Sequence, residues 1–184
     1  MNNTLKYKLD TAGIVAFVIG VSISVIVGRL FFFGTNVNEV ARLIFIEVIV
    51  NICATLFGAI SGALAGFLGV ICSMAICGQD IMFSDAVALA AIGTFIGIFA
   101  WKYGVREGNV GRTNLLLWSL MNALSLLVSF VFIKPFADFL VYDKNLFSGL
   151  DMGFRVLLIC VFPVGIGLAI FFVLVSKFIQ NVKK

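Results

Sequence analysis

Long apolar runs separated by short polar segments are the dominant pattern of this 184-residue chain. A helix needs about 20 apolar residues to cross the hydrocarbon core of a bilayer, and in lipid a helix satisfies its own backbone polar groups. Six runs have this length. They predict a single-domain, all-α integral membrane bundle over residues 1–184, with transmembrane helices at roughly 12–33, 39–57, 60–78, 83–101, 114–137 and 151–177.

The boundary between the second and third runs is marked only by small residues around Gly58 and Ser61. An unbroken helix over 39–78 would be about 60 Å long, because each residue adds 1.5 Å. That length is about twice the hydrocarbon thickness. We therefore expect a tight hairpin at this point.

The composition agrees with a lipid environment. The chain is 62% hydrophobic and 12% charged, with a mean hydropathy of +1.17, whereas soluble domains are about half apolar and a quarter charged. Too few polar residues are present to cover a water-exposed surface. The expected location is the cell membrane, as a multi-pass protein, and the first run is too long for the apolar region of a cleavable signal peptide.

The charged residues between the runs predict the orientation, because short cytoplasmic loops are rich in Lys and Arg. With both termini cytoplasmic, the inner segments hold most of the positive residues and the outer ones most of the acids. The net charge of +4 therefore reports topology, and we expect no nucleic-acid partner. The inner residues are Lys6, Lys8, Lys102, Arg106, Arg112, Lys177, Lys183 and Lys184, and the outer ones are Glu39, Asp80, Asp85, Asp138, Asp143 and Asp151.

Several kinds of chemistry are absent from the sequence. It contains no histidine, and its four cysteines lie in apolar runs without metal-ligand spacing. We therefore expect no metal site, no cofactor and no enzymatic activity. No Walker A motif is present either, so the chain is not expected to hydrolyse ATP itself.

Polar side chains within or beside apolar runs are costly in lipid and usually functional. Those in the outer half predict a substrate pocket, covered by the loops 34–39 and 142–149. The longest external loop is expected over 137–150 and includes the second of these. An ion pair of Glu47 with Arg155 or Arg42 is the structural alternative. The predicted substrate-binding residues are Arg29, Asn38, Arg42, Glu47, Asp85, Asn122, Lys134, Tyr142 and Arg155.

The first run carries small residues at four-residue spacing, namely Ala12, Ala16, Gly20, Ser24 and Gly28. Such a strip lets another helix approach closely. Two readings remain open: packing within the bundle, or docking of a partner protein on Ala12, Ala16 and Gly20.

These motifs resemble the S components of energy-coupling factor (ECF) transporters, which are substrate-binding membrane subunits. The size, the six expected spans and the Ala12-x-x-x-Ala16 strip are similar to that family. A closer resemblance is to a branch of S components of unsettled substrate, although Ala59 stands where that branch has proline. The residues that carry this likeness are Gly28-Arg29, Asn36-Val37-Asn38, Phe57-Gly58-Ala59-Ile60-Ser61-Gly62 and Lys134-Pro135 with Asp138 and Tyr142.

The resemblance implies a subunit that captures a vitamin or related micronutrient from outside. It then docks through the first helix on a coupling transmembrane subunit and topples, while two ATP-binding subunits reset the cycle. The alternative is a self-sufficient small secondary carrier or channel, although internal inverted repeats typical of carriers are not visible. A membrane enzyme acting on lipid is disfavoured by the lack of a catalytic pattern.

Overall fold

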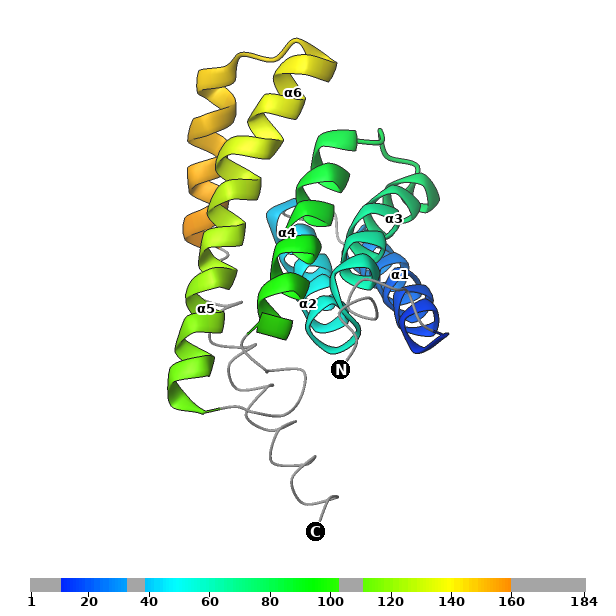
Figure 1. Cartoon of the computed structure of the whole chain (residues 1–184). Helices are drawn as coiled ribbons and strands as arrows, with labels where there is room; N and C mark the ends of the chain where they lie inside the picture. Colours follow the sequence, from blue (N-terminus) through cyan, green and yellow to red (C-terminus); the bar gives the residue numbers. More distant parts are fainter. Residues whose placement is uncertain (1–10, 33–38, 103–110, 160–184) are drawn as a thin grey trace.

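The computed structural model describes residues 11–32, 39–102 and 111–159, and every regular element within these ranges is helical (Figure 1). This confirms the all-α prediction for the part of the chain described. A further helical segment covers 146–159. The elements are α1 (Thr11–Phe32), α2 (Glu39–Phe57), α3 (Ala59–Cys77), α4 (Phe83–Lys102), α5 (Arg112–Leu126), the π-helical η3 (Leu127–Ile133) and α6 (Lys134–Tyr142).

Four stretches in these ranges are long and apolar enough to cross a membrane. They are Thr11–Leu30, Ala59–Cys77, Phe83–Ala100 and Thr113–Tyr142, the last formed by α5, η3 and α6 together. Large apolar side chains such as Ile26 and Leu116 lie on the outer surface of the bundle. The length and composition of the described helices are therefore those of a membrane protein.

The hairpin between α2 and α3 is confirmed. Helix α2 ends at Phe57, Gly58 has a φ of 101°, and α3 begins at Ala59. Glycine adopts this backbone conformation without a steric penalty. The Gly58 N–H still donates to the Ala54 carbonyl at 3.0 Å, so the chain reverses with one residue between the helices.

Helix α3 packs closely against α1, α2 and α4. Its glycines allow the contact with α4: a methyl group at Gly66 would lie 2.6 Å from the Leu89 carbonyl oxygen. On the other side, the Ser61 hydroxyl donates to the Gly13 carbonyl of α1 at 3.0 Å. Small residues at helix contacts are typical of membrane bundles, where close packing replaces the hydrophobic effect.

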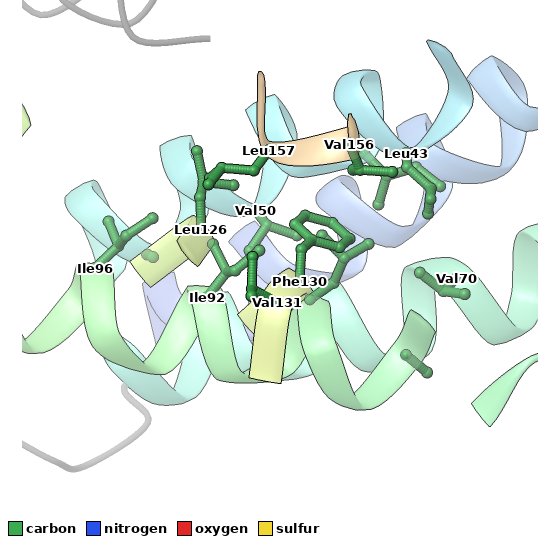
Figure 2. Close-up of a cluster of buried hydrophobic side chains, with 14 of the residues drawn as sticks. Leu43, Val50, Val70, Ile92, Ile96, Leu126, Phe130, Val131, Val156 and Leu157 are labelled. Atoms are coloured by element: carbon green, nitrogen blue, oxygen red, sulfur yellow. The ribbon is translucent and has the colours of Figure 1, made fainter. Parts of the chain in front are cut away.

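The apolar core joins α4 to the second half of the chain. Side chains of α2, α4, η3 and the segment 146–159 gather in one buried cluster, which includes Val50, Ile92, Phe130 and Val156 (Figure 2). The segment 146–159 runs alongside the long helix formed by α5, η3 and α6 (Figure 1). Because Leu43 and Val156 lie near the polar residues Arg42 and Lys134 at one end of the bundle, the core extends to that end.

The π-helical turns of η3 end directly before Lys134 and Pro135. Proline lacks the N–H that an α-helix requires at this position, and the Lys134 N–H donates to the Ser129 carbonyl, five residues earlier. Gly153 packs against the Phe130 carbonyl of this widened turn. The η3 segment thus fixes where the segment 146–159 lies.

The prediction of a long external loop over 137–150 is wrong. Helix α6 continues to Tyr142, only residues 143–145 are non-helical, and the next helical segment begins at 146. The fifth apolar helix therefore extends five residues beyond its expected end. The reason is that Asp138 is buried and ion-paired inside the bundle, so its charge does not mark a solvated loop.

Candidate functional site

A cavity of about 610 Å³ opens at the end of the bundle where α3 connects to α4 and α6 ends. Small-molecule sites are typically concave, of roughly 300–1,000 Å³, and combine an apolar lining with a few polar groups. The cavity has this character. Its lining residues are Arg42, Leu43, Met74, Gly78, Gln79, Asp80, Met82, Asp85, Lys134, Asp138, Lys144, Ser148, Gly149, Met152 and Val156.

Lys134 lies at the centre of a buried charge cluster. Its ammonium group contacts the Asp85 carboxylate of α4 and lies 3.4 Å from Asp138, one turn further along α6. The Ser84 hydroxyl donates to Asp138 at 2.6 Å, and the half-exposed Lys144 lies 3.6 Å from the same carboxylate. Buried charges are tolerated when they are paired and hydrogen-bonded, and this cluster meets that condition.

Arg42 forms a second polar group on the α2 side of the cavity. Its side chain is buried, and its guanidinium donates to the Gln79 amide oxygen. The end of α3 positions Gln79, because Gly78 adopts the left-handed conformation with a φ of 67°. The N–H of Gln79 then donates to the Met74 carbonyl at 3.0 Å, as is usual at helix C-termini.

Tyr142 fastens the end of α6 to the connection between α3 and α4. The Phe83 N–H donates to the Tyr142 hydroxyl at 2.8 Å, and that hydroxyl donates to the Ile81 carbonyl at 3.1 Å. The ammonium group of Lys144 lies 5.2 Å from the centre of the same ring. Together with the Lys134–Asp85 pair, these bonds hold the two sides of the cavity together.

The remaining wall is apolar and includes three methionines. Met74 and Met82 lie near the α3–α4 connection, and Met152 and Val156 are contributed by the segment 146–159. A methyl group at Gly149 would lie 3.0 Å from the Pro135 side chain, so the segment approaches α6 closely. The cavity therefore offers an ionic side and an adaptable apolar side.

Three predicted substrate-binding residues come together in this cavity, although they belong to different helices. Arg42 of α2, Asp85 of α4 and Lys134 of α6 all line it. Tyr142 lies beside the cavity and supports its edge through the bonds to Ile81 and Phe83. Asn38 lies outside the described residues.

Besides Tyr142, four predicted residues within the described part of the chain do not line the cavity. Arg29 is exposed and donates to the Ile76 carbonyl, and Arg155 is 74% exposed and pairs with Asp151, one turn before it. Glu47 and Asn122 are buried deeper in the bundle.

The alternative ion pair of Glu47 with Arg155 or Arg42 does not form. Asn51 instead donates to a Glu47 carboxylate oxygen at 3.5 Å. The second carboxylate oxygen has no hydrogen-bond partner among the described residues.

Sequence reasoning missed five polar residues of the cavity, namely Gln79, Asp80, Asp138, Lys144 and Ser148. Gln79 and Lys144 follow helix ends and carry no distinctive pattern. Asp138 was assigned to an external loop, although its spacing of four residues from Lys134 is that of an ion pair on one helix face. That spacing was the signal that could have placed both residues on α6.

The small-residue strip of α1 contributes to packing within the bundle. Gly20 faces inward, where an added methyl group would lie 2.9 Å from the Cys53 sulfur, and Ala16 is buried. Ala12 is exposed. Ala12, Ala16 and Gly20 also line an apolar groove of about 430 Å³ between α1 and α2. Internal packing is thus observed for Ala16 and Gly20, and docking of a partner on Ala12, Ala16 and Gly20 stays a prediction.

Over the described residues, these features define a helical protein with several helices of membrane-crossing length and a partly polar cavity at one end. The chain is similar to UPF0397 proteins of three lactobacilli. It is 24% identical over 144 residues to the protein of Lactobacillus johnsonii, covering 78% of this chain and 76% of the relative. It is 26% identical over 140 residues to that of Lactobacillus helveticus, covering 76% and 75%.

A third UPF0397 protein, from Lactobacillus acidophilus, is 26% identical over 145 residues, covering 78% of this chain and 76% of the relative. No family model matches the chain, and no solved structure matches it. The similarity therefore extends over about three quarters of the sequence, and the names of the relatives mention no substrate or partner.

Proposed function

We propose that this chain is the substrate-binding subunit of an ATP-driven importer of the ECF type. It would capture a vitamin or related micronutrient in the cavity and dock on a coupling transmembrane subunit served by two ATP-binding subunits. The observation that carries the proposal is the cavity of about 610 Å³, lined by Arg42, Asp85 and Lys134, at one end of a largely apolar bundle. A polar cavity is costly inside such a bundle and is typical of a ligand site.

The proposal includes six transmembrane helices with both termini in the cytoplasm. The alternation of the described helices puts the ends of α3 and α6 on one side and the α2–α3 hairpin on the other. The distribution of Lys and Arg in the sequence favours an external position for the side with the cavity. Substrate would then enter from outside.

The groove between α1 and α2 is the proposed docking surface. Its lining is almost entirely apolar, and it includes the exposed Ala12 and the small residues Ala16 and Gly20. Small residues permit the close helix contacts that hold membrane subunits together. Because the groove and the cavity lie on different parts of the bundle, docking and substrate capture would not compete for the same residues.

Co-purification with the ECF module of the same organism tests the proposal. A complex with a coupling subunit and two ATPases is expected, together with ATP-dependent uptake in proteoliposomes. Ala12→Trp should weaken the complex. Ala75→Trp is the matched control, because Ala75 is also exposed but lies near the C-terminal end of α3, outside the groove, and it should not weaken the complex. ATP-independent uptake by the isolated chain would instead favour a self-sufficient carrier, and equal recovery of the complex with both variants would exclude docking in the groove.

A further inference from the structure

Arg42 differs from the other cations of the cavity in its surroundings. Its side chain is only 7% exposed, and its one hydrogen bond in the described structure goes to the neutral amide of Gln79. A guanidinium group has five N–H donors. A buried charge without a counter-charge is unfavourable, so this group has both the capacity and the need for an anionic partner.

Two of the three carboxylates that line the cavity are already engaged elsewhere. Asp85 pairs with Lys134, and Asp138 pairs with Lys134 and Lys144. Asp80 is exposed, and Arg42 forms no ion pair with Asp80, Asp85 or Asp138, the carboxylates that line the cavity. The lining therefore presents one buried positive charge that the described part of the chain does not neutralise.

We infer that the cavity takes a small organic anion whose carboxylate or phosphate group binds the Arg42 guanidinium. The planar guanidinium matches both groups because it can donate two parallel hydrogen bonds to their oxygens. This inference rests on the proposed function, since it assigns a chemical class to the substrate of the same cavity.

The apolar side of the cavity defines the rest of the ligand. Leu43 lies one residue beyond Arg42 and also lines the cavity, and Met74 and Met82 belong to its lining as well. Thioether side chains adapt to flat or irregular apolar groups and contact aromatic rings favourably. An anion with a ring or another apolar body therefore fits better than inorganic phosphate alone.

Gln79 is a positioning residue for this interaction. Its amide oxygen accepts from Arg42 and directs the guanidinium, and its own backbone is fixed by the bond to Met74 after Gly78. Replacing Gln79 by Ala should therefore reduce anion affinity less than replacing Arg42. It should not alter the preference for an anion over a neutral analogue.

The test uses the purified full chain in detergent at constant ionic strength, with benzoate, phenyl phosphate and the neutral analogue benzamide as probes. Thermal unfolding is followed over a concentration series, because a ligand that binds only the folded state raises the midpoint by an amount that grows with the logarithm of its concentration relative to Kd. We expect benzoate or phenyl phosphate, but not benzamide, to raise the midpoint. A larger rise with benzoate would indicate a carboxylate ligand, and a larger rise with phenyl phosphate would indicate a phosphate ligand.

Arg42→Gln should reduce the apparent anion affinity at least about tenfold. Arg42→Lys should retain folding but lose part of the anion affinity, because an ammonium group cannot donate the two parallel hydrogen bonds of a planar guanidinium. Arg155→Gln, an exposed arginine outside the cavity, is the matched control and should respond as the unchanged chain. The inference is overturned if neither anion exceeds benzamide, or if the response to anions survives in the Arg42 variants. Recovery of the ECF complex is independent of these probes, so its failure would count against the proposed function alone.

Discussion

Lys134 of α6 contacts Asp85 of α4, and this buried ion pair connects the two helices at the edge of the cavity. The same ammonium group lies 3.4 Å from Asp138. Replacing Lys134 by Met leaves two buried carboxylates without their main counter-charge and should destabilise the fold by about 3 kcal/mol or more. The midpoint of thermal unfolding in detergent measures the effect.

The double variant Lys134→Met with Asp85→Asn provides the control for this pair. Since it removes one of the unpaired charges, it should recover part of the stability lost by Lys134→Met alone. Equal destabilisation by the single and double variants would show that the two side chains are not coupled.

Tyr142→Phe should loosen the connection between α3 and α4. The hydroxyl accepts from Phe83 and donates to Ile81, and each such bond contributes about 1 kcal/mol. We expect faster amide hydrogen exchange over residues 79–83 with little change elsewhere. Phe139→Leu alters an exposed aromatic residue of the same helix and should leave this exchange unchanged.

Gly78→Ala should destabilise the end of α3, because only glycine adopts a φ of 67° readily. A cost of about 1 kcal/mol is expected from the backbone alone, since an added methyl group would meet no neighbouring atom. Gly111→Ala is the matched control: Gly111 also faces open space but has a φ of −64°. The two variants should therefore differ in chemical unfolding, and identical midpoints would argue against a conformational role for Gly78.

Gly66→Ala should force α3 and α4 apart. The added methyl group would lie 2.6 Å from the Leu89 carbonyl oxygen, a backbone atom that moves only with its helix. Overpacking of this kind costs about 1–3 kcal/mol. At Gly69 the nearest atom is the Ser24 side-chain oxygen at 3.0 Å, which can move more easily. Gly69→Ala should therefore lower the unfolding midpoint less than Gly66→Ala.

Arg155→Ala should have little effect on the stability of the protein. The side chain is 74% exposed and pairs only with Asp151 on the same helix face. Exposed pairs of this spacing contribute about 0.3–0.5 kcal/mol. A loss of more than 2 kcal/mol in thermal unfolding would show that Arg155 has a partner beyond Asp151.

The apolar runs predicted the described helices well because span length is a property of the sequence alone. The α2–α3 hairpin followed from the same length argument, and Gly58 provides it. The run that includes Lys134 and Asp138 was ended too early, because a charged residue was taken as a sign of solvent. In the fold the two charges neutralise each other one turn apart, so the helix continues to Tyr142.

The cavity was predicted only in part, for a related reason. Hydropathy gives the depth of a residue along its helix but not the direction in which its side chain points around the helix axis. Arg42 and Arg155 were both expected near the starts of apolar helices, yet one lines the cavity and the other is exposed. That difference depends on how each helix is rotated about its own axis. For the segment 146–159, which carries Arg155, the close packing of Gly149 and Gly153 determines this rotation.

The π-helical segment over 127–133 also constrains how related sequences can be compared with this one. Such segments hold more residues than an α-helix of equal length, and each residue turns an α-helix by about 100°. A homologue that lacks one residue here could form regular α-helical turns instead, and because the extra residue is contained within the widened turns, α6 would keep the same face toward α4. Its counterparts of Lys134 and Asp138 should then be displaced by one position, and an alignment gap inside a continuous helix would be the visible sign.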